Sequence, residues 1–386
     1  MTHETGTAPA KHAPDRREGK MGRIKNLDEI KAMVRERTGK RTVFRGARIE
    51  DVEPVLDRLT TKDPELWAVE WSRAAEPYAE AGEAHEAAGR VAEAREAFLM
   101  AYVYHTIGRY PVPLSPGKQD CARKSLELYL RAARHFTPAL EVLEIPYPGD
   151  RVIRAFLRKP EGVSPCPVVI NFGGIDSYKP ECHEYDEALL SAGLGVCAMD
   201  MPGVGEAPIK GSTTAESLFS AVIDYLGERE DVDARRIAIL GRSFGGYWSA
   251  KMSFVEPERL RAAVVWGGGV HYNFQADWVR RSTNAESYLM DHEFCRASAF
   301  GLCNLDDLVS YFPSLSLKTQ GLLDKPSCPM LVVNGKNDLQ TPIDDLYLLL
   351  EHGGPKTARV FPGGHMGQTP QTLPTIVRWL QRELRE

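Results

Sequence analysis

One serine in the chain stands in a pattern that favours nucleophilic catalysis. Residues 241–245 have the sequence GRSFG, directly after the apolar run 236–240 and directly before a helical pattern. A G-x-S-x-G pattern between a strand and a helix holds the serine in a sharp, strained turn that exposes its hydroxyl above the sheet. The small residues on either side allow neighbouring backbone to pass closely. We therefore predict that Ser243 is a nucleophile.

Two residues farther along the chain supply the base and the acid that such a serine needs. A serine hydroxyl is a weak nucleophile at neutral pH, so a base must take its proton and a carboxylate must orient that base. Asp338 ends the segment 329–338 (PMLVVNGKND), and His365 ends the segment 358–365 (ARVFPGGH). Both follow predicted parallel strands, where ligand-facing loops emerge. We predict His365 as the base and Asp338 as the acid.

Two other carboxylates are alternatives for the acid. Asp344 and Asp345 are close to Asp338 in sequence, but they open a helical pattern directly after Pro342. Aspartate is favoured in the first turn of a helix, because its charge interacts with the helix dipole and it can cap the first amides. We therefore assign these two residues to helix capping.

Acyl transfer also needs two N–H donors for the developing oxyanion. One donor is the amide of the residue after the nucleophile, here Phe244. The second comes from the loop after an earlier strand, and the segment 166–174 (CPVVINFGG) ends in such a loop. We predict Gly174 or Ile175 as this donor, with a plain turn at Gly173 and Gly174 as the alternative interpretation.

Seven short apolar runs alternate with helical patterns after residue 146, which predicts an α/β fold. The runs lie at 151–159, 166–174, 194–203, 236–243, 261–269, 329–338 and 358–365. Continuous apolar strands are typical of a parallel sheet that is buried on both faces. We therefore expect residues 141–386 to form a domain with a mostly parallel, doubly wound sheet. Residues 273–326 lack a strand pattern and are too long for a simple crossover, which predicts a helical insertion near the mouth of the site.

The region ahead of this domain has a different pattern. Residues 27–140 are rich in alanine and glutamate, with apolar residues three and four positions apart, which predicts a helical domain that caps the site. We expect Gly82 and Gly89 to divide it into short helices. A tetratricopeptide-like helix pair is the alternative to a single bundle, although no second copy follows at a fixed period. Residues 1–26 are polar and predict a flexible tail.

Composition excludes several classes of protein. A net charge of −5 and a pI near 6.1 argue against a nucleic-acid partner. No uncharged apolar run reaches the roughly 18 residues of a membrane span, and the polar start lacks a secretory signal, so we expect a cytoplasmic protein. The 7 cysteines are scattered without a C-x-x-C pair, which fits reduced thiols. We expect neither a metal nor a cofactor.

The motifs GRSFGG, NFGG and DMPGVG, with the order Ser, Asp, His along the chain, resemble the α/β-hydrolase family. The helical region, including residues 110–129 (YPVPLSPGKQDCARKSLELY), resembles the group of 2,6-dihydroxypseudooxynicotine hydrolase and fungal polyketide-shortening hydrolases, with the fermentation/respiration switch protein more distant. The resemblance implies cleavage of a C–C bond next to a ketone by Ser243, Asp338 and His365, without metal or cofactor, often in a homodimer. Members can also carry a pocket carboxylate after the next strand, but residues 267–274 (GGGVHYNF) contain none.

Residues near other predicted strand ends are candidates for substrate contacts. Tyr178 follows the predicted oxyanion loop, Trp248 lies in the helix after the serine, and His271 and Tyr272 follow three glycines. A pocket lined by aromatic residues suits a phenolic or polyketide-like substrate. Packing in the core or at the rim is the alternative for each residue. Arg242 either steers an anionic substrate or pairs with a carboxylate.

These observations predict a serine hydrolase that acts on a ketone or ester of a mid-sized aromatic or polyketide-like molecule, and the resemblance favours cleavage of a C–C bond next to a ketone. A carboxylesterase, a lactonase or an acyltransferase would use the same groups, and the sequence does not separate these reactions. A non-catalytic regulator that keeps the fold is the alternative from another class. The complete set of serine, aspartate and histidine argues against it, because a binding module has no use for a strained serine.

Overall fold

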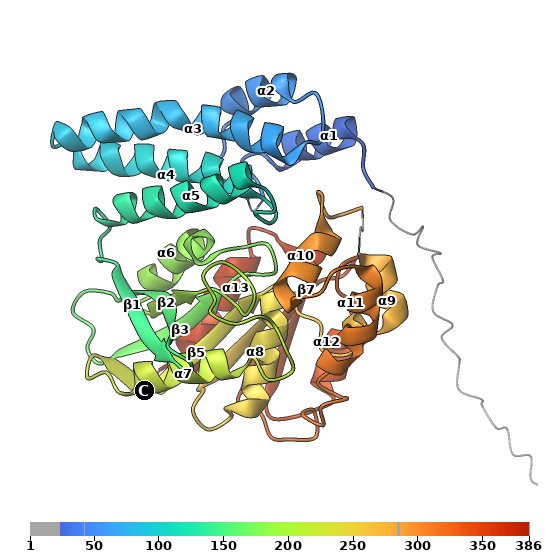
Figure 1. Ribbon diagram of the computed structural model, residues 1–386. Helices are drawn as coiled ribbons and strands as arrows, with labels where there is room; N and C mark the ends of the chain where they lie inside the picture. Colours follow the sequence, from blue (N-terminus) through green and yellow to red (C-terminus); the bar gives the residue numbers. More distant parts are fainter. Residues whose placement is uncertain (1–23, 42, 284–285, 386) are drawn as a thin grey trace, which may run out of the picture.

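An eight-stranded sheet forms the centre of the computed structural model, which describes residues 24–41, 43–283 and 286–385 (Figure 1). In space the strands run in the order β1-β2-β4-β3-β5-β6-β7-β8. The pairs from β4 to β8 are parallel, whereas β2 is antiparallel to both of its neighbours. The strands are β1 (Glu141–Tyr147), β2 (Arg151–Arg158), β3 (Cys166–Phe172), β4 (Gly195–Met199), β5 (Val232–Arg242), β6 (Ala262–Trp266), β7 (Met330–Gly335) and β8 (Lys356–Phe361).

Helices cover both faces of the sheet, as the apolar runs predicted. In β3 every residue is buried, because successive side chains point to opposite faces and both faces are covered. Val168 and Ile170 pack in the core beneath α7 (Ser217–Gly227) and α8 (Phe244–Val255). Val169 packs in the second core, beneath α6 (His183–Ser191) and α13 (Thr372–Glu383). This confirms the predicted α/β fold with a doubly wound, mostly parallel sheet.

All seven predicted strands are present, and the sequence pattern missed only β1 among the eight described here. This strand lies at the edge of the sheet, and Glu141 and Glu144 are exposed. Pro146 lies within it, and an edge strand tolerates proline because one side of the strand makes no ladder hydrogen bonds. The alternation of charged and apolar residues with a proline therefore hid a strand that pairs with β2.

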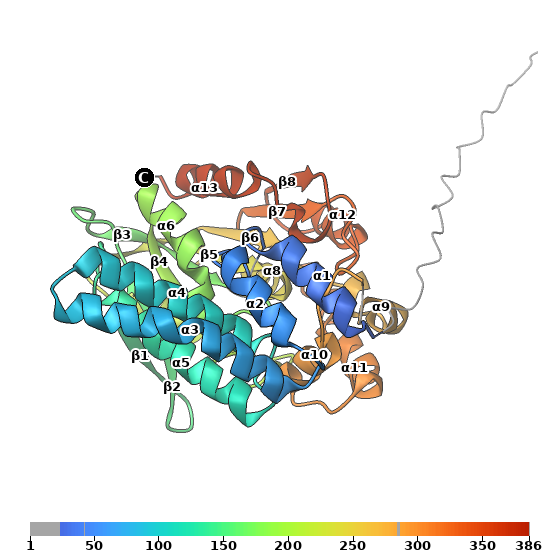
Figure 2. The same ribbon diagram turned by 90° about the horizontal axis from the view of Figure 1, so that it is seen from above.

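The first five described helices form a layer over the sheet, called the helical layer below. They are α1 (Leu27–Arg37), α2 (Ile49–Arg58), α3 (Pro64–Ala87), α4 (Val91–Arg109) and α5 (Pro116–Ala133). Figures 1 and 2 show the layer from the side and from above, with α1 on the side that faces α10. Its α4 and α5 share a core with Phe156 of β2 and Ala198 of β4, which attaches the layer to the sheet.

The prediction that Gly82 breaks a helix is wrong. Gly82 lies inside α3, and a Cβ atom there would come within 2.5 Å of the Phe98 ring. The glycine therefore allows α3 and α4 to pack closely rather than ending a helix. Gly89 does separate the two helices, with a positive φ of 70°.

Residues 273–326 contain three helices and no strand in the ranges that the structure describes. The helices are α9 (Ala276–Ser282), α10 (His292–Phe300) and α11 (Leu305–Tyr311). Leu289 of this segment belongs to the apolar core of the helical layer, so the two helical regions pack together. Of the predicted tail at residues 1–26, residues 1–23 lie outside the described residues. Asn26 caps α1. No described helix is long and apolar enough to cross a membrane.

Candidate active site

Ser243 lies in the sharp turn between β5 and α8. Its backbone has φ 55° and ψ −125°, a strained conformation for a residue with a side chain. Its amide donates to the Trp266 carbonyl oxygen at 2.7 Å, which ties the turn to β6. A Cβ atom on Gly241 would collide with the Gly245 carbonyl oxygen, so the small residues of the motif allow the backbone to cross itself.

Three side chains from three strand ends form a continuous chain of hydrogen bonds. Ser243 Oγ lies 2.7 Å from His365 Nε2, and His365 Nδ1 lies 2.7 Å from Asp338 Oδ2. The imidazole is 9% exposed and the Asp338 carboxylate is fully buried. Only Nε2 faces the serine, so the ring can accept the hydroxyl proton there while its other nitrogen donates to the carboxylate.

The surroundings of Asp338 keep it ionised. Burial alone would raise the pKa of its carboxyl, but the charge and hydrogen bond of His365 and two backbone amides bring that pKa below its usual value. These amides belong to Gln340 and Thr341, which donate to Asp338 Oδ1 at 2.8 and 3.2 Å. One oxygen is thus held by the backbone, and the other is left to orient the imidazole.

The loop that carries His365 is fixed by two residues that the sequence analysis did not single out. Asn334, in β7, accepts the Met366 amide at 3.1 Å through its side-chain oxygen. Trp266, in β6, donates its ring N–H to the Met366 carbonyl oxygen at 2.6 Å. Met366 has a positive φ of 66°, so the loop turns sharply just after the histidine. An asparagine inside an otherwise apolar strand was the available signal.

Asp345 lies in the first turn of its helix, as predicted, but its side chain does not cap that helix. Its buried carboxylate accepts the amides of His271, Tyr272 and Asn273 at 2.8, 2.8 and 2.9 Å, so it holds the loop after β6. Burial raises the pKa of Asp345 to about 6 despite these bonds. Asp344, in the same first turn of α12 (Asp344–Leu350), is exposed. Neither residue contacts His365.

The loop after β3 lies directly against Ser243. A Cβ atom on Gly174 would be 2.8 Å from Ser243 Cβ and 3.1 Å from its Oγ. In the described ranges no acceptor is bonded to the amides of Gly174, Ile175 or Phe244. The Ser177 amide donates to the Gly174 carbonyl oxygen and closes the loop. Three unused N–H groups therefore surround the turn that carries the serine hydroxyl.

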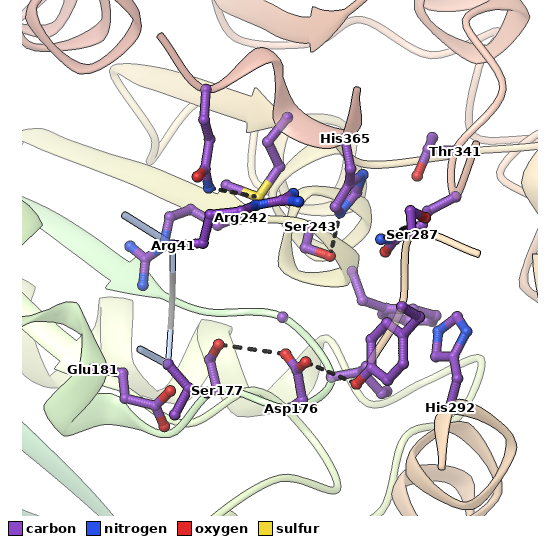
Figure 3. Close-up of a pocket in the computed structure, with 18 of the residues that line it drawn as sticks. Arg41, Asp176, Ser177, Glu181, Arg242, Ser243, Ser287, His292, Thr341 and His365 are labelled. Atoms are coloured by element: carbon purple, nitrogen blue, oxygen red, sulfur yellow. Dashed lines mark hydrogen bonds between the residues drawn. The ribbon is translucent and has the colours of Figure 1, made fainter. Parts of the chain in front are cut away.

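A cavity of about 110 Å³ opens beside Ser243 (Figure 3). Its walls come from the ends of β3 and β5, the loops after β6, β7 and β8, the helical layer with its loops, and the segment 287–296. Five aromatic residues line it beside four arginines, namely Tyr110, Tyr185, Phe244, Tyr247 and Tyr288. The helical layer contributes Arg37 and Arg41 from α1 and the loop after it. The cavity thus forms where the helical layer meets the sheet.

The four predicted substrate contacts are absent from the described lining of this cavity. Tyr178 lies on the other side of its loop, where the Arg109 guanidinium stacks on its ring at 3.8 Å. Trp248 is fully buried among core residues and packs against Phe219 of α7, with ring centroids 5.9 Å apart. His271 Nδ1 forms a hydrogen bond with Ser316 Oγ at 2.7 Å. Tyr272 lies on the surface and is 41% exposed.

Arg242 is buried, lines the cavity and has no carboxylate partner in the described ranges. It donates to Asn171 Oδ1 at 2.6 Å and to Cys182 Sγ at 3.2 Å, and it stacks over Tyr185. Asn171 in turn donates to Asp186 at 2.6 Å. Arg242 is therefore linked to the Asp186 carboxylate only through the side-chain amide of Asn171.

Three buried polar residues of the cavity wall each have an atom without a hydrogen-bond partner in the described ranges. These atoms are Asn273 Oδ1, His292 Nδ1 and Arg296 Nε. Burial keeps the pKa of His292 well below its usual value, so its ring is neutral. The sequence analysis missed all three residues. An arginine among small and apolar residues in CRASAF was a signal for Arg296.

The comparison with known families decides what kind of protein has this site. The family described as “Esterase FrsA-like” matches residues 47–385. The chain belongs to this family. FrsA-like esterases are hydrolases, so the predicted enzyme class and the resemblance stated above are confirmed.

Individual relatives of this FrsA-like chain agree with the assignment. Esterase FrsA of Photobacterium profundum is 26% identical over 340 residues, which cover 86% of this chain and 80% of the relative. The 2,6-dihydropseudooxynicotine hydrolase of Paenarthrobacter nicotinovorans is 27% identical over 292 residues, 74% of each chain. The crystal structure of 2,6-dihydroxy-pseudo-oxynicotine hydrolase has a TM-score of 0.76 at 24% identity and covers 92% of this chain and 95% of that one. That likeness confirms the α/β-hydrolase fold.

Proposed function

We propose that this FrsA-like esterase is a serine hydrolase with Ser243 as nucleophile, His365 as base and Asp338 as acid. The observation that carries the proposal is the unbroken pair of 2.7 Å hydrogen bonds from hydroxyl to imidazole to carboxylate. The strained backbone of the serine adds support, because strain of this kind is kept at functional sites.

In this mechanism Ser243 Oγ attacks a substrate carbonyl carbon while His365 Nε2 takes the hydroxyl proton. Asp338 stabilises the imidazolium that results. The unused amides of Ile175 and Phe244 are the donors we assign to the oxyanion, and each such donor is worth about 3 kcal/mol in the transition state. His365 then gives its proton to the leaving group, and water releases the acyl group in a second round.

The bond we propose is a C–C bond next to a ketone in an aromatic or polyketide-like molecule. The aromatic lining of the cavity suits such a molecule. A relative named as a pseudooxynicotine hydrolase matches both the core and the helical region, which supports the same choice. Ester hydrolysis is the second candidate, favoured by the relatives named esterase FrsA. The two reactions differ in whether the proton goes to a carbon or to an oxygen.

The helical layer has a part in this proposal. Arg37, Arg41 and Tyr110 of the layer and its loops line the cavity together with Ser243. We propose that the layer closes the cavity over the reacting groups, and that exclusion of water strengthens the charge interactions at the oxyanion.

Labelling with a fluorophosphonate tests the nucleophile. Wild-type protein is expected to be labelled at Ser243, and the variants S243A and H365Q are expected to remain unlabelled. Absence of label on the folded wild-type protein refutes the serine hydrolase.

Turnover of aryl β-diketones and of aryl esters with matched acyl groups then tests the bond. Cleavage of the diketones supports the C–C reaction, whereas turnover of the esters alone shows that the second candidate is correct.

A further inference from the structure

The described ranges contain five buried arginines, and these differ in whether a carboxylate neutralises them. They are Arg37, Arg109, Arg158, Arg242 and Arg296. Arg109 and Arg158 each form an ion pair with a glutamate. The other three form no ion pair with any described residue, and all three line the cavity beside Ser243. Unpaired buried cations therefore occur at the proposed active site.

A buried charge without a counter-ion is costly, so such groups are normally paired. Two carboxylates also line the cavity, but each already has a partner. Asp176 accepts the Tyr288 hydroxyl at 2.7 Å, and Glu181 pairs with Arg109 behind the wall. The cavity lining holds four arginines and only these two carboxylates. The cavity lining thus has more positive than negative side chains, and the ionised Asp338 carboxylate lies just behind His365.

Among these arginines, only Arg296 has a fully buried nitrogen without a hydrogen-bond partner in the described ranges. Its Nη1 donates to the hydroxyls of Ser282 and Thr283 at 3.1 and 3.0 Å. No partner for Nε or Nη2 is found in the described ranges. Nε is fully buried, which leaves Nη2 as the unpartnered nitrogen that can meet an anion in the cavity. Arg37 and Arg242 also donate to neutral groups.

Arg41 is a fourth cation of the lining without an ion pair in the described part of the chain, and it is half-buried where the other three are buried. Its side chain lines the cavity and makes no ion pair or hydrogen bond with the described residues. Figure 3 shows Arg41 on one side of Ser243 and His292, one helical turn before Arg296, on the other. Arg41 and the helix that carries His292 therefore lie on opposite sides of Ser243.

We propose that the substrate carries a carboxylate, that Nη2 of Arg296 binds it, and that Arg41 draws the anion to the cavity. This inference rests on the proposed function and deepens it, because it names the chemical class of the substrate. Arg296 acts here as a specificity-determining residue. It holds the anion in place while the acyl carbon meets Ser243, and it takes no part in bond cleavage.

Binding of benzoate and of its neutral analogue benzamide to the S243A protein tests the proposal without any need for turnover. Calorimetric titration is expected to show that benzoate binds more tightly. We expect R296Q to weaken benzoate binding about 10- to 100-fold, the range for a hydrogen bond to a charged group. Benzamide binding should not change. R296K keeps the positive charge but replaces the planar guanidinium with an ammonium group, so we expect an intermediate affinity for benzoate.

Two further variants keep the test decisive. R158Q removes another buried arginine, far from the cavity and paired with Glu187, and it should leave benzoate binding unchanged. R41Q alters only a half-buried side chain, so it should fold and bind benzoate more weakly even if R296Q does not fold. Equal affinity for benzoate and benzamide, or unchanged benzoate binding in both R296Q and R41Q, overturns the proposal.

Kinetics separate this inference from the proposed function. We expect mono-4-nitrophenyl glutarate or 4-carboxyphenyl butyrate to be hydrolysed with a kcat/KM about tenfold above its uncharged analogue, and R296Q to abolish that preference. Equal kcat/KM for charged and uncharged esters overturns the carboxylate site and leaves the serine hydrolase intact. Failure of fluorophosphonate to label Ser243 instead refutes the hydrolase, while the titrations still decide the carboxylate site.

Discussion

Replacement of Gly174 by alanine would test how closely the loop after β3 fits the nucleophile. The backbone of Gly174 does not have a positive φ, so an alanine is limited by space alone. Its Cβ would lie 2.8 Å from Ser243 Cβ, whereas ordinary contacts begin at 3.4 Å, so the two must separate by about 0.6 Å. A shift of that size stretches the 2.7 Å bond from Ser243 to His365 or moves the Ile175 amide.

Either displacement should reduce catalysis strongly. Misplacement of a reacting group by about 1 Å, or loss of one oxyanion donor, costs about 100-fold in rate. We therefore expect G174A to lower kcat on an aryl ester or β-diketone about 30- to 100-fold while KM changes little. The rate of fluorophosphonate labelling should fall in parallel. Thermal unfolding should show that the variant is folded.

Gly227 offers a matched control at the end of α7. A Cβ there would meet only Ala234 Cβ, at 3.9 Å, so G227A should keep full activity. If G174A retains kcat within threefold of wild type, the loop does not position the reacting groups as we argue, and the assignment of the oxyanion donors fails with it.

Three further predictions concern charge and packing. D338N should fold normally and lower kcat about 10⁴-fold, because the amide cannot stabilise the His365 imidazolium; a loss below tenfold in single-turnover assays would contradict this. Burial raises the pKa of Asp186 from an ordinary 3.8 to about 7. Between these two pH values the native state keeps a proton that the unfolded chain has released. The free energy of unfolding therefore falls as pH rises through this window. The free energy of unfolding of D186N, measured in urea, should therefore rise by about 2–3 kcal/mol relative to that of wild type between pH 5 and pH 8. A difference between the two proteins that does not change with pH would refute the raised pKa. G82A should lower the free energy of unfolding by about 1–2 kcal/mol, since its Cβ meets the Phe98 ring at 2.5 Å; equal or higher stability would show that α3 can move away from α4.

The parts of the molecule that could be predicted from the sequence are those encoded by local patterns. Buried strands appear as apolar runs, and a nucleophile turn has a fixed motif, so seven strands and the positions of Ser243, Asp338 and His365 at strand ends could be read directly. The edge strand β1 escaped because exposed glutamates and Pro146 interrupt its apolar pattern. An interior glycine such as Gly82 was read as a helix break, because the neighbouring helix that requires it is invisible in sequence.

The cavity walls could not be predicted in the same way. Which side of a loop a side chain faces depends on packing between segments far apart in the chain. Tyr178 stacks on Arg109 of α4, so it turns away from the cavity that its own loop helps to form. Arg296 lines the same cavity because α10 packs beside the helical layer, and no short motif records that contact. Residue type suggested aromatic contacts, whereas the unpaired charges became visible only in three dimensions.

The groups that we propose to react and those that we propose to bind the substrate are carried by different parts of this chain. Ser243, Asp338 and His365 are held by strand ends whose geometry the sheet dictates, while Arg41 and Arg296 stand on a loop and a short helix outside it. Mutations in those outer segments can thus change which molecules are accepted while the reactive centre keeps its form. Because of this separation, a few substitutions in the outer segments can redirect the same reaction to new metabolites. Positions 41 and 296 are therefore the first to vary in any effort to alter selectivity.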